Sequence, residues 1–213
     1  MTKFRLLVAD DHTLVADLCS QLLETKFDVV GTVSNGRDLI RAALQLKPNV
    51  IVVDITMPLL NGLDAGEQVK DLLPAVKLIF MTMNCDTDLA AEAFRRGAYG
   101  YLLKTCAASE MVIAVREVLR GRTYMSQALC KDEVNYVRRL ENRLLDKEYR
   151  LTRRQREVLQ LLAEGKEMKE VADVLNMSTR TVAYHKYRMM EVVGAKNTAE
   201  LVRYAVRTHI VAA

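Results

Sequence analysis

The sequence predicts an α/β domain with a doubly wound, five-stranded parallel sheet, followed by a small all-α domain containing a helix-turn-helix. Short apolar runs rich in β-branched residues alternate with stretches long enough for a helix, which predicts parallel strands joined by helical crossovers. These runs are residues 4–9, 50–53, 78–81 and 101–103. Closely spaced helix start and stop residues after residue 151 predict the second domain. The expected divisions are residues 1–120, a charged helical linker over 121–149, and residues 150–213.

Polar side chains follow the apolar runs. They are Asp10, Asp11, Asp54, Thr82 and Lys104. Because ligands bind at the carboxyl ends of the strands in such a sheet, we expect these side chains to converge. Adjacent carboxylates repel unless a hard cation lies between them, and oxygen ligands favour Mg²⁺ over zinc. Asp54 could then attack a phosphoryl group, while Lys104 and Thr82 stabilise charge on the phosphoryl oxygens.

The acidic pair, residues 54–62, Thr82 and residues 100–104 together resemble a two-component receiver domain over about residues 3–120. The resemblance implies a flavodoxin-like sheet of order 2-1-3-4-5. It also implies that Asp54 is the phosphoacceptor for a sensor histidine kinase.

The same resemblance implies roles for the neighbouring residues. Asp11 and Asp54 would bind Mg²⁺ directly, Asp10 through water, and the Thr56 carbonyl would complete the protein ligands. Thr82 and Tyr101 match the switch positions of the family, and Lys104 would hold a phosphoryl oxygen. A haloacid-dehalogenase-like phosphatase would need a second Asp where Thr56 stands, so an independent phosphatase or ATPase is not expected.

Composition indicates the cellular location of the protein and the state of its cysteines. No apolar run among the 213 residues approaches membrane-spanning length, and the start of the chain lacks the pattern of a signal peptide, so a cytoplasmic protein without a membrane partner is expected. The four cysteines form no Cys-x-x-Cys pair, which argues against zinc and against a disulfide framework. Cys85 and Cys106 follow Thr82 and Lys104 closely, which raises the hypothesis that oxidation interferes with phosphorylation.

Charge is divided unevenly along the chain. Residues 1–120 carry 13 Lys and Arg against 15 Asp and Glu, whereas residues 121–213 carry 18 against 12. The basic second half points to nucleic acid. Between the halves, residues 131–150 have apolar side chains spaced three and four apart, as in an amphipathic helix. That helix could pack on the first domain or pair with a second subunit.

Residues typical of helix starts and helix ends predict the second domain. Residues 152–155 form a capping box, Gly165 stops that helix, Ser178 can cap a later helix, and Gly194 can end it. One face of this later helix carries residues suited to a major groove. They are Arg180, Tyr184, Tyr187 and Arg188.

Residues 151–159, 164–166, 169–172 and 178–186, continuing through 199–202, resemble the LuxR-type helix-turn-helix. The resemblance implies phosphate contacts from Thr152, Arg154 and Lys169, and a dimer contact from helix 198–208. It also implies a recognition helix lined by Thr181, Val182, Tyr184, His185, Lys186, Tyr187 and Arg188, with Val182 divided between core and interface. No set of metal ligands is expected around His12, His185 or His209.

Together these features predict a response regulator of the NarL/FixJ type. It would be a transcription factor and not an enzyme, switched by Mg²⁺-dependent phosphorylation of Asp54. Phosphorylation would release or pair the DNA-binding domains, giving a homodimer on promoter half-sites of double-stranded DNA. The alternative is a receiver that docks other proteins and regulates without phosphate.

Overall fold

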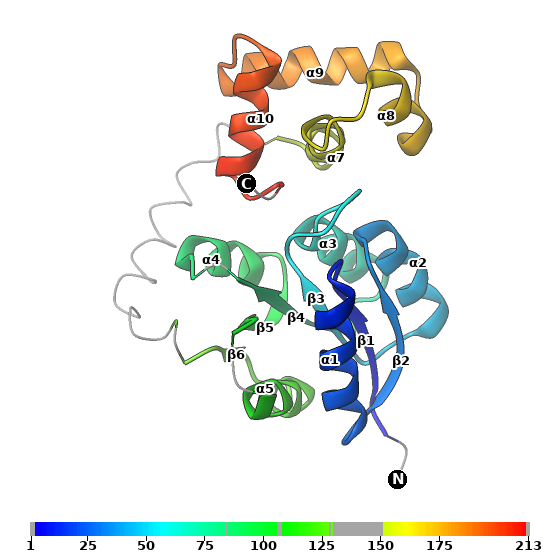
Figure 1. The fold of residues 1–213 in the computed structure, drawn as a ribbon, viewed down its shortest axis with the longest axis vertical. Coiled ribbons are helices and arrows are strands. Elements are labelled where there is room, and N and C mark those ends of the chain that lie inside the picture. Colours follow the sequence, from blue (N-terminus) through cyan, green and yellow to red (C-terminus); the bar gives the residue numbers. More distant parts are fainter. Residues whose placement is uncertain (1–2, 84, 106–107, 128, 130–150, 212–213) are drawn as a thin grey trace.

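The protein is described by a computed structural model covering residues 3–83, 85–105, 108–127, 129 and 151–211. An α/β domain and a smaller helical domain lie one beside the other along the long axis of the molecule (Figure 1). The predicted linker helix over 131–150 lies outside the described residues. In the part of the chain that is described, no helix combines the length and apolar character needed to span a membrane.

The α/β domain alternates strands and helices as predicted. Its elements are β1 (Arg5–Ala9), α1 (Thr13–Glu24), β2 (Asp28–Val33), α2 (Gly36–Leu46), β3 (Val50–Asp54), α3 (Gly62–Leu72), β4 (Lys77–Thr82), α4 (Thr87–Arg95), β5 (Ala98–Leu103), α5 (Ala108–Leu119) and β6 (Tyr124–Met125). The strands pair in parallel in the order β2-β1-β3-β4-β5-β6, which confirms the predicted order 2-1-3-4-5. The two-residue strand β6 extends the sheet beyond residue 120, the predicted end of the domain.

The central strands send alternate side chains into two separate cores. In β1, Leu7 and Ala9 face a core completed by α2, α3 and α4, whereas Leu6 and Val8 face a second core completed by α1 and α5. Strand β3 alternates in the same way. Strands covered on both faces must be apolar throughout, which explains the continuous apolar runs in the sequence.

The loop between β3 and α3 is held close to the end of β3. The Gly62 amide donates a 2.8 Å hydrogen bond to the Ile55 carbonyl, and the Asn61 side chain caps α3 by accepting from the Asp64 amide. A Cβ on Gly62 would lie only 1.9 Å from the Asp54 carbonyl oxygen. Glycine is therefore required here by the close approach of two backbone segments.

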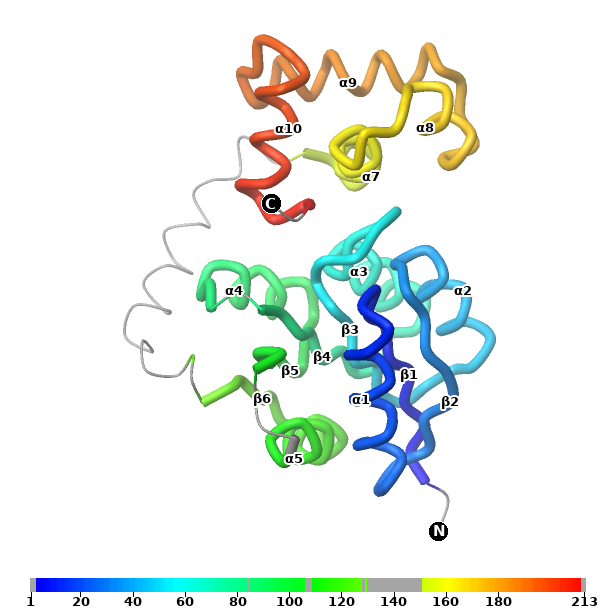
Figure 2. Tube along the Cα trace, in the orientation of Figure 1, coloured from blue at the N-terminus to red at the C-terminus, as the bar shows by residue number. Residues whose placement is uncertain are grey.

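The helical domain consists of α7 (Arg153–Ala163), α8 (Met168–Leu175), α9 (Thr179–Val193) and α10 (Thr198–Arg207). The predicted capping box of Thr152 and Gln155 is confirmed, as are the Ser178 cap and the end of α9 at Gly194, where φ is +68°. Figure 2 shows α7 and the end of α10 nearest the α/β domain, with α9 on the far side.

Replacing Gly62 by Ala should destabilise the protein by about 1–3 kcal/mol, because the new methyl group must displace the backbone of Asp54. Chemical denaturation would measure the loss. Gly31→Ala is the matched control, since its Cβ would meet only the flexible side chains of Leu46 and Leu7, at 3.3 and 3.7 Å. Equal stability losses in the two variants would contradict this account of the loop.

Candidate functional site

The structure brings together the polar residues that end the strands. Asp10 and Asp11 follow β1, Asp54 ends β3, Thr82 ends β4, and Lys104 follows β5. The parallel register places these carboxyl ends at one edge of the sheet. A bond from the Lys104 amide to the Thr82 carbonyl, 2.8 Å long, sets the start of the loop that carries the ammonium group.

Lys104 bridges two buried carboxylates. Its Nζ lies 2.7 Å from Oδ2 of Asp10 and 2.9 Å from Oδ2 of Asp54. Asp54 is only 3% exposed, and Asp10 is buried as well. Burial lowers the pKa of Lys104, but its hydrogen bonds with Asp10 and Asp54 outweigh burial and raise it overall, so the side chain stays charged. A fixed cation therefore touches the proposed nucleophile.

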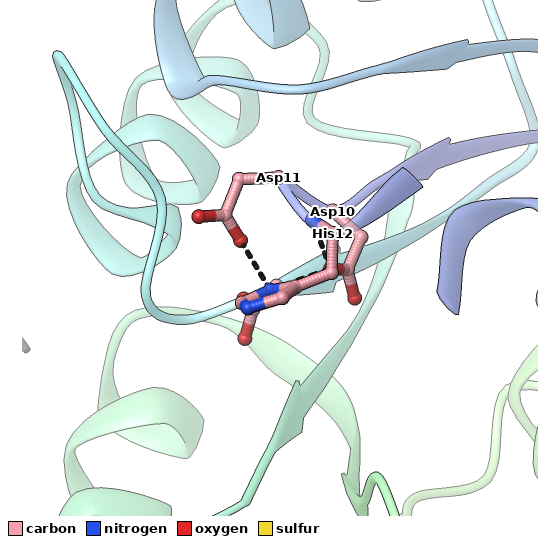
Figure 3. A group of neighbouring side chains, drawn as sticks. Asp10, Asp11 and His12 are labelled. Carbon is pink, nitrogen blue, oxygen red and sulfur yellow. Dashed lines mark hydrogen bonds and ion pairs between the residues drawn. The ribbon is translucent and has the colours of Figure 1, made fainter. Parts of the chain in front are cut away.

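Asp10, Asp11, His12 and Asp54 form an acidic cluster. The first three of these residues lie between β1 and α1, and Figure 3 shows their side chains together. Nδ1 of His12 is 2.9 Å from Oδ1 of Asp11, and the His12 backbone amide donates to Oδ1 of Asp10 at 3.0 Å. One ligand atom from each of Asp10, Asp11, His12 and Asp54 lies within 4.8 Å of the others. No ligand set was expected around His12, but the turn after β1 folds its ring back toward these carboxylates.

The chemistry of this cluster fits a hard divalent cation. Three carboxylates face one ammonium group, so two negative charges remain when all are ionised. Oxygen atoms dominate the donor set, as Mg²⁺ prefers. The pocket formed by Asp10, Asp11 and Asp54 is thus typical of a Mg²⁺ site. Thr56 lies two residues after Asp54, in the β3–α3 loop, and it is exposed. Its backbone amide donates a hydrogen bond to the Asp54 carboxylate.

The electrostatics of Asp54 follow from its burial. Burial raises the pKa of Asp54 to about 6, and the hydrogen bond from Lys104 opposes that rise. Asp54 is therefore largely ionised at neutral pH, but burial makes its ionised form less favourable than that of an exposed carboxylate. A nucleophilic carboxylate that is held by one cation and poorly solvated is suited to attack on phosphorus.

The two residues at the expected switch positions are both buried. Thr82 is 3% exposed, and the ring of Tyr101 is fully buried in the core formed with α4. Burial raises the pKa of Tyr101, and the nearby Asp86 and Cys85 add to the rise. Cys85 itself is exposed, whereas Cys106 lies outside the described residues.

The helical domain presents the outer face of α9 to solvent. Tyr184 and Tyr187 are 61% and 63% exposed, and Arg180 and Arg188 are exposed beside them. Thr181 is exposed as well, and Lys186 is partly so. Figure 1 shows this helix on the side of the helical domain away from the sheet.

Two residues expected to line the recognition helix are less exposed than their neighbours. Val182 is fully buried in the core of the helical domain, so it supports α9 from beneath. His185 is partly buried, and burial followed by the charge of Arg154 lowers its pKa, which keeps the imidazole neutral at pH 7. Arg154 donates to Glu157 at 2.8 Å and to the Leu175 carbonyl.

The other two expected phosphate contacts, Thr152 and Lys169, are exposed near the starts of α7 and α8.

Comparison with known families agrees with this division of the chain. Residues 6–116 match the response regulator receiver domain, and residues 149–205 match the bacterial regulatory proteins of the luxR family. The oxygen regulatory protein NreC of Staphylococcus aureus (strain JH9) is 32% identical over 210 residues, which are 95% of this chain and 97% of NreC.

Solved structures of full-length regulators are similar too. The RcsB response regulator of Salmonella typhimurium is 26% identical, with a TM-score of 0.63 over 96% of this chain and 97% of that one. A structure of two RcsB dimers bound to two parallel DNAs is also 26% identical, with a TM-score of 0.57 over 95% of this chain and 98% of that one.

In Mg²⁺-free buffer with chelator, Asp54→Asn should be more stable than the wild type above pH 6 by roughly 1–3 kcal/mol, because it removes a buried charge. Since the pKa of Asp54 is raised to about 6, the cost of ionising it grows as the pH rises from about 4 and is complete above 6. Denaturant unfolding at several pH values would measure this difference. Asp28→Asn, at the exposed start of β2, is the control, and a pH-independent gain in Asp54→Asn would refute the argument.

Proposed function

Because the chain belongs to the bacterial response regulators that join a receiver domain to a LuxR-type DNA-binding domain, we propose that Mg²⁺-dependent phosphorylation of Asp54 by a sensor histidine kinase switches its binding to DNA. Members of this family are transcription regulators and not enzymes. The observation that carries the proposal is the contact of the Lys104 ammonium with both Asp10 and Asp54 inside the acidic cluster.

The proposed chemistry is a direct transfer. An oxygen of Asp54 bonds to phosphorus as the bond between phosphorus and the kinase histidine nitrogen breaks, which leaves an acyl phosphate on Asp54. Asp10, Asp11, Asp54 and the Thr56 carbonyl would hold Mg²⁺, which supplies positive charge next to the phosphoryl oxygens. Lys104 would move to one of these oxygens, so the Lys104–Asp54 contact is exchanged for a contact with the product.

The Thr82 hydroxyl would bind another phosphoryl oxygen, and the response of Tyr101 to that movement would alter the surface around α4. This exchange of contacts supplies the energy that separates two states of the receiver.

The output of the switch is proposed to be DNA binding by α9. Its exposed arginines and tyrosines would enter a major groove, with Thr181, His185 and Lys186 beside them, while Thr152, Arg154 and Lys169 approach phosphates. RcsB binds DNA as dimers, which supports a homodimer of this chain on two half-sites, with α10 supplying a dimer contact.

Phosphorylation at Asp54 can be tested with acetyl phosphate and Mg²⁺, followed by mass spectrometry of the intact protein. The wild type and Asp28→Asn should each gain one phosphoryl group, and Asp54→Asn should gain none, because it lacks the nucleophile. If Asp54→Asn also responded normally at promoters in cells, regulation by phosphate-independent docking would replace this proposal.

The DNA surface can be tested with duplexes enriched from a random pool on the wild-type protein. Arg188→Ala should weaken binding and reduce the slope of log affinity against log salt by about one, because removing one cation from the DNA interface lowers the number of counterions released on binding. Arg41→Ala, on the exposed face of α2, should leave both quantities unchanged. Unaltered affinity and slope in Arg188→Ala would remove this residue from the interface.

A further inference from the structure

One side chain of the DNA-binding domain reaches into the receiver at the β3–α3 loop. Gln160 of α7 is 1% exposed, and its amide is fully engaged. Nε2 donates to the Met57 carbonyl at 2.9 Å, and Oε1 accepts from the Asn61 backbone amide at 2.7 Å. The amide of one side chain therefore bonds the loop after Asp54 at two points, Met57 and Asn61.

This loop also carries a proposed metal ligand. Thr56 lies between Asp54 and Met57, and its amide bonds the Asp54 carboxylate. The bond from the Gly62 amide to the Ile55 carbonyl closes the base of the loop, and Gln160 is one of several attachments farther out. Losing Gln160 would leave the buried Asn61 amide and the Met57 carbonyl without these partners, which is unfavourable away from water.

Neighbouring contacts keep α7 over the loop. Oε1 of Glu164 accepts from the Leu59 amide at 2.9 Å, and the Leu59 side chain packs against the core of the helical domain. Arg156 pairs with Asp64 at 2.7 Å and with Glu67 at 3.0 Å. Gln160 therefore lies within a larger contact between the two domains.

The contact leaves the DNA-facing helix free. Docking uses α7 and the chain beyond α10, where His209 lies 3.1 Å from Asp86, whereas Tyr184 and Tyr187 of α9 stay exposed. The receiver therefore does not cover the proposed recognition surface in this arrangement. The contact itself offers one link between the two functions.

We infer that Gln160 is a positioning residue for the receiver site: a side chain of the DNA-binding domain holds the phosphoacceptor loop, so that Mg²⁺ binding at Asp54 and docking of the DNA-binding domain are coupled. The inference rests on the proposed function of Asp54. Coupling of this kind is reciprocal. If docking of α7 changes the free energy of Mg²⁺ binding at Asp54, then Mg²⁺ binding changes the free energy of docking by the same amount.

The test is Mg²⁺ titration of the full-length protein by calorimetry, which needs no phosphorylation. Gln160→Met keeps the length of the side chain and its preference for helix but makes neither loop bond. We expect its dissociation constant for Mg²⁺ to rise roughly fivefold or more, because the loop with the Thr56 carbonyl is no longer held. Gln160→Glu would place a buried carboxylate against the Met57 carbonyl and against Oε1 of Glu164, which the Gln160 amide binds at 2.8 Å, so it should raise the dissociation constant at least as much.

Arg153→Ala is the matched control. Arg153 is also on α7 and binds the receiver through Asp71 at 2.7 Å, but this ion pair is exposed, contributes little to docking and does not touch the loop, so Mg²⁺ affinity should stay at the wild-type value. Wild-type affinity in both Gln160 variants, or an equal loss in Arg153→Ala, would overturn the positioning role. If the wild type bound no Mg²⁺, the proposed function itself would fail. Thermal unfolding by circular dichroism confirms that each variant is folded.

Discussion

The ammonium group of Lys104, held between the carboxylates of Asp10 and Asp54, links residues at the ends of three strands of the sheet. Two buried carboxylates this close would repel each other strongly without a cation between them. The contact requires β1, β3 and β5 to end at the same edge of the sheet, and the parallel α/β architecture provides this edge. It also leaves an excess of negative charge in the cluster, which suits a divalent cation.

Much of this site could be predicted from the sequence, because each functional side chain directly follows an apolar strand whose burial on both faces is visible as a continuous run. Strand β6 could not be predicted, since two residues have no periodicity. The approach of the His12 ring to Asp11 could not be predicted, because the turn that produces it is set by backbone geometry. Gln160 was missed because its partners on the loop lie 99 and 103 positions earlier in the chain, and no local pattern of residue types shows such contacts.

The β3–α3 loop connects the two halves of the molecule. Its base is closed by the bond between Gly62 and Ile55, and its tip is bound by α7. The exposed face of α9 shows that this contact leaves the expected DNA-contacting residues of α9 accessible. The inferred coupling therefore acts through the attachment of α7 and does not need the receiver to cover α9.

The connection between Asp54 and α7 can be measured by hydrogen exchange with mass spectrometry, comparing Mg²⁺ alone with Mg²⁺ and beryllofluoride as a phosphoryl mimic. The mimic should change amide exchange both in the β3–α3 loop and in α7 of the wild type, and it should change neither in Asp54→Asn. A change confined to the loop, with α7 unaffected, would contradict the proposed connection between the phosphorylation site and the DNA-binding domain.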